Sequence, residues 1–299
     1  PVENHLVELW SQFSFLNPGL LGSLKQFKAK YGQASKNEED MFRLRALVSP
    51  FIMRRVKKEV LTELPEKTEL VHHIELSPKE RSAYEAVRQD SLRISETGEK
   101  NSAIKLFAAL TRLRQVCCDP HLVFEQMSDT SSKLKEALQL VNEAREGGHK
   151  ILVFSQFVQL LKRCGALLEE QGIEFSYLDG QSNTKKRKQA IEQFKSGKHD
   201  VFLISLKAGG AGLNLTEADT VIHLDPWWNP AVEDQASDRA YRMGQTNPVT
   251  VYRLVAINTI EEKIIQLHEE KRNLADKVLS GQSEASHLKP EMLLALLSD

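Results

Sequence analysis

The chain has 299 residues, of which 41% are hydrophobic and 27% charged, so it can form one large or two modest domains with buried cores. Its formal net charge of −1 excludes a generally basic protein, and any nucleic-acid binding must therefore come from a local patch. No apolar run is long enough to cross a membrane, and residues 1–4 do not begin a signal peptide.

The cysteines predict free thiols, with neither a disulfide nor a metal site. Cys117 and Cys118 are adjacent, and neither they nor Cys164 belong to a Cys-x-x-Cys pair. His121 does not complete a usual zinc spacing with them, so no metal ligand is expected. Free thiols indicate a reducing intracellular compartment, the cytoplasm or nucleoid of a prokaryote or the nucleus of a eukaryote.

The first 145 residues predict a mainly helical region. Apolar side chains recur there at helical spacing, for example Leu106, Leu110, Leu113 and Val116, and prolines punctuate the pattern. Strand signals are few in this part of the chain.

From about Lys150 short apolar runs alternate with helical patterns. Strands are predicted at residues 150–154, 175–178, 201–205, 220–224 and 249–255, with helices between them, one of them at 184–195. This alternation favours an α/β fold, a parallel sheet with helices on both faces. Because ligands of such sheets bind at the carboxyl ends of the strands, the residues just after each strand are candidates for function.

Two of the predicted connections carry basic residues or glycines. The run Lys185–Lys188 opens the helix at 184–195 and is either a contact for the DNA backbone or a solvated helix face. Ser205 to Thr216 is glycine-rich, and its backbone N–H groups would be able to approach a phosphate closely. A structural strand-to-helix turn would have the same composition.

Asp225 directly follows the strand predicted at 220–224, a position at which P-loop enzymes have a magnesium-binding carboxylate. We reject that interpretation, because the chain has no GxxxxGK[ST] loop and Pro226 stands where a catalytic glutamate would follow. Of the two tryptophans after it, Trp227 is nearer the strand and is expected to be the more buried. Trp228 stands at the mouth of the predicted sheet, directly ahead of the helix that follows.

Residues 229–245 predict one helix with two arginines on one face. Residues that favour helix termini mark its ends: Asn229, Pro230 and Gly244. Gln235, Arg239 and Arg242 fall at i, i+4 and i+7 within it. Two guanidinium groups on one face suit the stabilisation of charge on a transferring γ-phosphate. A solvated face with ion pairs to Asp238 or Glu233 is the alternative.

In their order along the chain, these segments resemble motifs four, five and six of the SWI/SNF-type family in helicase superfamily two. The matching segments are Ile151–Phe157, Leu178–Gly180, Ser205–Thr216, Trp228–Pro230 and Gln235–Gln245. Three further segments resemble blocks upstream of the family's second lobe: Leu64–Lys67, Leu113–Cys117 and Ser132–Leu134. Pro1–Asn4 resembles the tail of motif three. The family usually has a single tryptophan at Asp-Trp-Asn-Pro, whereas this chain has Asp-Pro-Trp-Trp-Asn-Pro.

The resemblance implies the C-terminal motor lobe of an ATP-dependent double-stranded DNA translocase or remodeller. Arg239 and Arg242 would reach the γ-phosphate, with Gln235 hydrogen-bonding nearby. The other implied residues are Gly210, Gly212 and Asp238 at the nucleotide, and Ser155, Gln156, Lys186, Arg187, Ser205, Lys207 and Trp228 at the DNA. ATP and Mg²⁺ would be held mainly by a first lobe with Walker A and B motifs, so this chain alone is expected to be inactive. The implied partners are double-stranded DNA, that first lobe and a DNA-bound protein target, with no membrane.

The implied domains are the end of the first lobe with connecting helices at 1–60, a helical protrusion at 61–130, a second RecA-like lobe at 131–280 and a helical tail at 281–299. Two alternatives stay open. A lobe of an RNA helicase would share the Gln-Arg-Arg spacing but not the Trp-Asn-Pro block. A non-enzymatic DNA- or protein-binding scaffold would have no need of both arginines.

Overall fold

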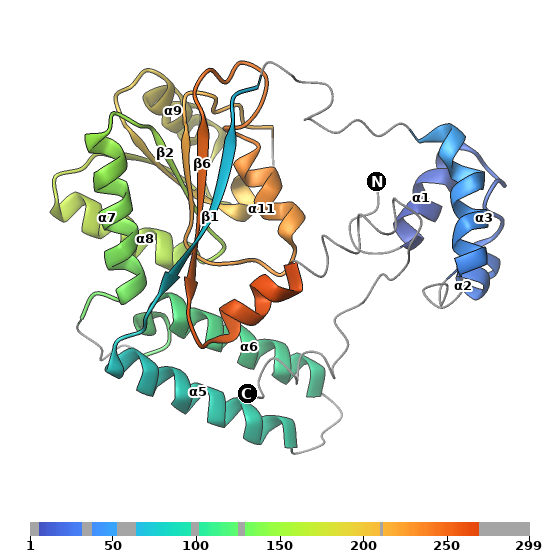
Figure 1. Ribbon diagram of the computed structural model, residues 1–299, viewed down its shortest axis with the longest axis horizontal. Helices are drawn as coiled ribbons and strands as arrows, with labels where there is room; N and C mark the ends of the chain where they lie inside the picture. The colour runs from blue at the N-terminus through green and yellow to red at the C-terminus, as the bar shows by residue number, and fades with distance from the viewer. Residues whose placement is uncertain are drawn as a thin grey trace. The chain divides into compact units, whose positions relative to one another are not determined.

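The computed structural model describes residues 6–31, 38–52, 64–96, 102–124, 129–209 and 212–268. These residues form two compact units, one within residues 6–52 and one that begins after residue 62 (Figure 1). Predictions for Pro1–Asn4, Gly210 and the tail at 281–299 lie outside the described residues.

The first unit consists of three short helices, α1 (Leu6–Leu16), α2 (Leu24–Tyr31) and α3 (Glu38–Val48), followed by the 3₁₀ turn η2 (Ser49–Phe51). They bury a small apolar cluster of their own, made by Leu9, Phe13, Leu21, Phe27, Tyr31, Leu44 and Val48. This unit is helical, as the sequence predicts for the start of the chain.

The second unit is built on a six-stranded sheet in the order β1-β6-β5-β2-β4-β3, in which all the pairs are parallel. The strands are β1 (Lys67–Ile74), β2 (Ile151–Ser155), β3 (Phe175–Leu178), β4 (Val201–Ser205), β5 (Thr220–His223) and β6 (Val249–Ala256). The parallel α/β fold predicted from residue 150 onward is therefore confirmed.

Strand β1 was not predicted, and it lies within residues 61–130, which were assigned to a helical protrusion. It pairs along its full length with β6, from Lys67 opposite Val249 to Ile74 opposite Ala256. It forms one edge of the sheet, and only Ile74 among its residues is buried. An edge strand with so little burial needs no apolar run, which is the signal on which the prediction of strands depended.

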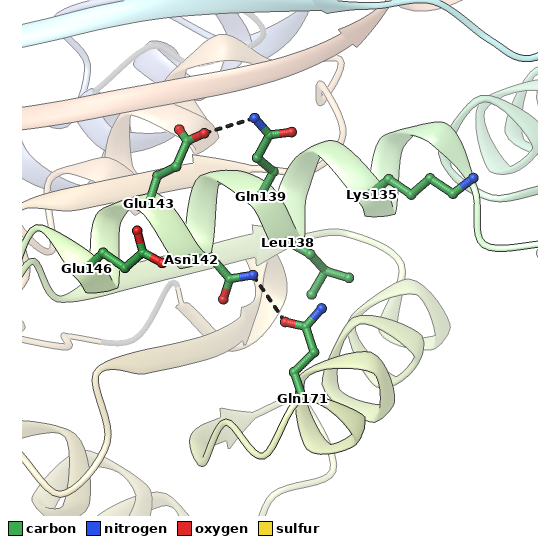
Figure 2. A pocket seen from close by; sticks show the side chains of 7 residues that line it. All are labelled: Lys135, Leu138, Gln139, Asn142, Glu143, Glu146 and Gln171. Atoms are coloured by element: carbon green, nitrogen blue, oxygen red, sulfur yellow. Dashed lines mark hydrogen bonds between the residues drawn. The ribbon is translucent and has the colours of Figure 1, made fainter.

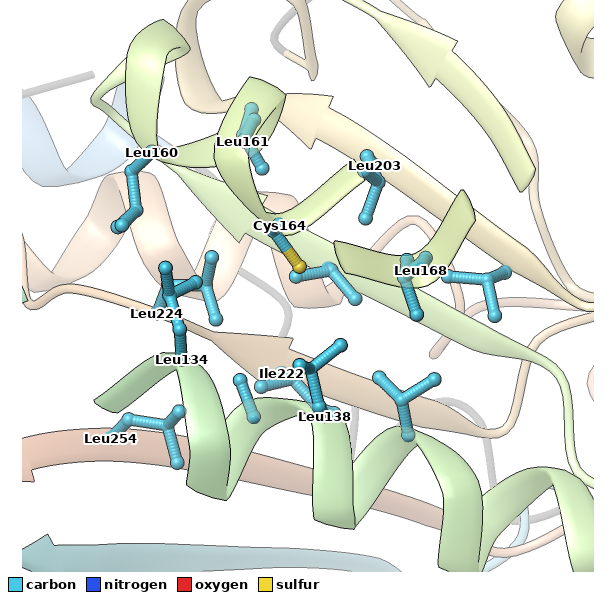
Figure 3. Close-up of a cluster of buried hydrophobic side chains, with 14 of the residues drawn as sticks. Leu134, Leu138, Leu160, Leu161, Cys164, Leu168, Leu203, Ile222, Leu224 and Leu254 are labelled. Carbon is cyan, nitrogen blue, oxygen red and sulfur yellow. The ribbon is translucent and has the colours of Figure 1, made fainter. Parts of the chain in front are cut away.

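Helices cover both faces of the sheet, α7 (Ser132–Glu146) and α8 (Val158–Glu170) on one face, α9 (Thr184–Lys195) and α11 (Pro230–Ser237) on the other (Figure 1). Alternate strand residues enter the two cores: Ile151 and Val153 pack with α7 and α8, whereas Leu152 and Phe154 pack with α9 and α11. Figure 3 shows the first of these cores. Burial on both faces explains why these strands read as continuous apolar runs.

Helices α5 (Pro78–Glu96) and α6 (Ser102–Cys118) pack against each other, and the 3₁₀ turn η3 (Pro120–Leu122) follows them. Because α5 follows β1 directly, the pair lies at the carboxyl ends of the strands (Figure 1). Arg81 donates hydrogen bonds to the carbonyl oxygens of Ile257 and Asn258, at 2.8 and 2.7 Å. The helical pair is thus attached to the segment that follows β6.

A hollow of about 360 Å³ lies on the outer side of α7, next to Gln171 at the end of α8 (Figure 2). Its lining contains none of the site residues predicted from the sequence. Within the described ranges, no helix is both long and apolar enough to pass through a lipid bilayer.

Candidate functional site

Helix α11 is shorter than the helix predicted at residues 229–245. It begins as predicted, because the side chain of Asn229 accepts a hydrogen bond from the N–H of Ala231 at 3.1 Å and Pro230 occupies the first turn. It ends at Ser237, and residues 238–244 form consecutive tight turns that finish at Gly244 with φ +96°. Gln235, Arg239 and Arg242 therefore do not share one continuous helical face, which corrects the sequence analysis.

Contacts with the rest of the lobe explain this early end. The carbonyl oxygen of Arg239 accepts a hydrogen bond from the N–H of Leu215 at 3.0 Å, a partner outside the helix. The hydroxyl of Ser237 lies 2.9 Å from Nε2 of His223 on β5, and Ala240 is completely buried. Tertiary packing thus outweighs the local preference for a longer helix.

Three arginines lie close enough for their charges to interact: Arg187 from the first turn of α9, Arg239 and Arg242. We call them the arginine cluster. Arg239 is only 9% exposed, and desolvation, followed by the positive charges of Arg242 and Arg187, lowers its pKa. Three like charges gathered in one place favour an anion that would neutralise them. Arg187 was predicted as a DNA contact, and its position beside the two arginines was not.

The arginine cluster also holds the glycine-rich connection after β4. Nη1 of Arg187 donates to the carbonyl oxygen of Ala208, and Nη1 of Arg242 to that of Leu213, both at 3.4 Å. Gly212 in this connection has φ +57°, a conformation that favours glycine. The glycine-rich connection and the arginines therefore lie in contact with each other, and their shared role at a nucleotide stays a prediction.

Two further residues predicted for the nucleotide, Gln235 and Asp238, lie at the C-terminal end of α11. Gln235 is on the exposed side of α11, two residues before the helix ends. Asp238 forms the C-terminal cap of α11, and its negative charge acts to raise the pKa of Arg239.

A second cluster, the strand-end cluster, lies at the carboxyl ends of β2 and β5 and consists of Ser155, Gln156, Asp225 and Arg114. One carboxylate oxygen of Asp225 accepts hydrogen bonds from the Ser155 hydroxyl and, at 3.2 Å, from the N–H of Gln156. The other lies 3.3 Å from Nη2 of Arg114, which comes from α6. Burial raises the pKa of Asp225, whereas the charge of Arg114 and the Ser155 hydrogen bond act to keep it ionised. Both oxygens of the carboxylate thus have partners within the protein.

Aromatic rings enclose the guanidinium group of Arg114. Its central carbon lies 5.4 Å from the ring centre of Phe157, 5.4 Å from that of Trp227 and 5.1 Å from that of Trp228. Both tryptophans are half-buried, and Trp227, the one expected to be more buried, packs against the core that contains Phe154 and Ala236. The position of Arg114 in the apolar stripe of its helix was the signal in the sequence that would have identified it.

The candidate DNA contacts differ in how accessible they are. Lys207 is exposed, Gln156 is half-buried, and Lys186 lies on the exposed first turn of α9. The hydroxyls of Ser155 and Ser205 are buried, and that of Ser205 accepts a hydrogen bond from the N–H of Ala208 at 3.3 Å. These two serines fix the loops in which they lie.

Helix α11 connects the two clusters, because the strand-end cluster precedes its N-terminus and the arginine cluster follows its C-terminus. Glu233 anchors the first turns: its carboxylate accepts from the N–H of Trp227 at 2.7 Å and from Nε of Arg253 on β6 at 2.8 Å. The arrangement can bind an anion at one end of α11 and present loops at the other. Across the described residues, no group of three or more His, Cys, Asp or Glu side chains is placed to hold a metal ion.

Comparison with known proteins identifies the family of this chain. The helicase conserved C-terminal domain matches residues 132–244, and the SNF2-related domain matches residues 1–122. The chain is 41% identical over 280 residues to an uncharacterised ATP-dependent helicase of Mycoplasma pneumoniae, covering 93% of this chain and 27% of the relative. A SWI/SNF-related regulator of chromatin from Mus musculus, subfamily A member 1, is 33% identical over 294 residues, covering 93% and 28%.

Among solved structures, the Sulfolobus solfataricus SWI2/SNF2 ATPase core in complex with double-stranded DNA has a TM-score of 0.65 and 35% identity. The match covers 100% of this chain and 65% of that one. The chain spans about a quarter of the length of the relatives named above. On these matches and on its RecA-like sheet, the chain belongs to the SWI/SNF family of ATP-dependent helicases and corresponds to the C-terminal half of its ATPase core.

Proposed function

We propose that this chain is the C-terminal motor lobe of an ATP-dependent translocase on double-stranded DNA. The observation that carries the proposal is the arginine cluster, in which Arg187, Arg239 and Arg242 meet beside the glycine-rich connection. A scaffold that only bound DNA or protein would have no need of three arginines gathered beside a glycine-rich connection, whereas guanidinium groups and backbone N–H groups together suit the oxygens of a phosphate.

In the proposed mechanism, Arg239 and Arg242 stabilise the negative charge that develops on the γ-phosphate of ATP during hydrolysis. The planar, permanently charged guanidinium group is suited to phosphate oxygens, so the residues present fit a triphosphate. Mg²⁺, when bound, neutralises the phosphate oxygens, and the proposal assigns it to the ATP-binding lobe, together with most contacts to ATP. Gln235, Asp238 and Gly212 complete the side of the nucleotide site that this chain supplies.

The proposed DNA contacts are with the phosphate backbone. Lys186, Lys207 and Gln156 supply donors to phosphates, and Trp228 packs against the sugar–phosphate groove. Such contacts position a protein on the duplex without reading its sequence. Support comes from the archaeal SWI2/SNF2 core, which was solved with double-stranded DNA. Movement of the two lobes relative to each other would then convert hydrolysis into steps along the duplex.

The test is ATP hydrolysis by this chain alone and by the enzyme with both lobes, each with duplex DNA, single-stranded RNA or no nucleic acid. We expect no significant turnover by the chain alone and turnover stimulated by duplex DNA in the two-lobe enzyme. Stimulation by RNA but not by DNA would replace the proposal with an RNA helicase. Absence of hydrolysis in the two-lobe enzyme would favour the non-enzymatic scaffold.

A further inference from the structure

Arg114 is a charged side chain buried where an apolar one would be expected. It is 1% exposed, on the apolar face of α6 that also carries Leu110 and Leu113. Its Nη2 donates to the carbonyl oxygen of Pro226 and to Asp225, whereas its Nε is buried with no hydrogen-bond partner among the described residues. An unsatisfied buried donor is unfavourable, and buried ion pairs are often replaceable by apolar residues without loss of stability. Stability alone therefore gives a poor account of an arginine at this position.

The guanidinium group instead joins three segments that are distant in the sequence. It comes from α6, it faces Phe157 in the segment after β2, and it faces Trp227 and Trp228 in the segment after β5. Asp225 completes the connection, because the same carboxylate binds Arg114 and the Ser155–Gln156 turn.

The segment after β5 leads directly into α11. Trp228 is followed by the cap residue Asn229 and the helix, whose other end leads to Arg239 and Arg242. Glu233 ties the N–H of Trp227 to α11 itself, at 2.7 Å. The strand-end cluster and the arginine cluster are thus joined through the tryptophan segment and α11.

We propose that Arg114 is a positioning residue. It joins the helical pair α5–α6 to the duplex-facing segments at the carboxyl ends of β2 and β5, and it couples these segments to the arginines beyond α11. This inference rests on the proposed function. Arg114 touches neither nucleotide nor reacting atoms; it sets the position of Trp228 and of the start of α11. Its loss uncouples contact with the duplex from hydrolysis and leaves the site for each ligand in place.

The test uses the two-lobe enzyme and the ratio of duplex-stimulated to basal ATP turnover. Arg114→Lys keeps a positive charge for Asp225, but an ammonium group cannot reproduce the planar contact with three rings. The expected result is a fall of about tenfold or more in the ratio, within the range of coupling between sites in proteins. The duplex Kd and the melting temperature are measured on the same samples and are expected to change little.

Arg112→Lys is the matched control, because Arg112 lies on the same helix, is exposed and is outside the strand-end cluster. It is expected to leave the ratio unchanged. Phe157→Leu is a second variant, which keeps apolar bulk and removes one of the three rings. It is expected to lower the ratio less than Arg114→Lys does, and it decides the question if Arg114→Lys does not fold.

A wild-type ratio in folded Arg114→Lys, or in Phe157→Leu if only that variant folds, would overturn the inference. A large fall in melting temperature with the ratio intact would also overturn it, since this is the behaviour of a purely structural residue. If the wild-type enzyme itself shows no stimulation by duplex DNA, the proposed function fails first, and the role of Arg114 fails with it.

Discussion

Buried charges in the RecA-like lobe are matched by partners, and Lys133 shows how much depends on one of them. It lies in the first turn of α7, completely buried, with its ammonium nitrogen 2.7 and 2.5 Å from the two oxygens of Glu261. Glu261 also accepts from the N–H of Ala256 at the end of β6. Burial acts to lower the pKa of Lys133, but the charge and hydrogen bond of Glu261, together with the neighbouring Cys117 and Cys118, outweigh it and raise that pKa.

Lys133→Met should reduce the free energy of unfolding by about 3–5 kcal/mol, because it leaves the Glu261 carboxylate buried without its partner. Lys135→Met, at an exposed position two residues further along α7, should change it by less than about 0.5 kcal/mol. Urea unfolding followed by circular dichroism measures both. Equal stabilities of the two variants would show that the pair contributes little.

At the scale of single residues, the sequence offers candidates but not their partners in the fold. The nucleotide roles of Arg239 and Arg242 stay predictions, and the structure places the charge of Arg187 close to Arg239. The contacts of Arg114 and Glu233 were not predicted, because their ion-pair partners, Asp225 and Arg253, are 111 and 20 residues away in the sequence. A charged residue at an apolar helical position was the available signal for Arg114.

Among the elements, β1 joins the sheet through charged side chains. Arg253 on β6 donates to Glu69 on β1 and to Glu233 on α11, both at 2.8 Å. Partial burial acts to raise the pKa of Glu69, but the hydrogen bond from Lys67 and the charges of Arg253 and Lys67 outweigh it and lower the pKa to about 2. The folded state therefore favours the ionised carboxylate and gains stability from it.

Glu69→Gln should consequently destabilise the protein in a pH-dependent way. A carboxyl group with a lowered folded-state pKa contributes its full stability above the unfolded pKa, near 4.5, and loses it as the pH falls towards 2. At pH 7 the variant should lose up to about 3 kcal/mol, an upper limit given by the size of the shift. Unfolding titrations from pH 7 to pH 2 should show the difference from wild type shrinking below pH 4.5. A difference that stays constant over this range would contradict the assignment, and Glu75→Gln, exposed just after β1, controls for the loss of one charge.

The strands and helix α11 show which elements the sequence could predict and which it could not. The buried strands β2, β4, β5 and β6 were predicted nearly to the residue, because burial on both faces leaves an apolar run. The polar edge strand β1 was missed for the opposite reason. Helix α11 was predicted too long, since the bond between Leu215 and Arg239 that ends it is tertiary. In each case the error lies where contacts distant in the sequence outweigh the local pattern.

At the scale of the whole molecule, a net charge of −1 requires that DNA binding come from local basic side chains. Binding of duplexes should be independent of sequence and should weaken steeply with salt, because each neutralised phosphate releases counterions. Lys207→Ala should lower the slope of log K against log salt by about 1, whereas Lys79→Ala, an exposed lysine on α5 paired with Asp129, should not. Fluorescence anisotropy on unrelated duplexes measures this, and a marked preference for one sequence would exclude backbone binding as the main contact.

The arginines that this chain is proposed to supply for ATP hydrolysis can be tested by removing one of them. Duplex-stimulated turnover is measured for the two-lobe enzyme carrying Arg242→Ala, with Arg93→Ala, an exposed arginine on α5, as the matched control. We expect a loss of roughly 10³–10⁵ in rate for Arg242→Ala, with duplex binding retained, and poor rescue by Arg242→Lys. Arg93→Ala should behave as wild type. Turnover by Arg242→Ala equal to that of Arg93→Ala would show that Arg242 is a solvated surface residue with no part in hydrolysis.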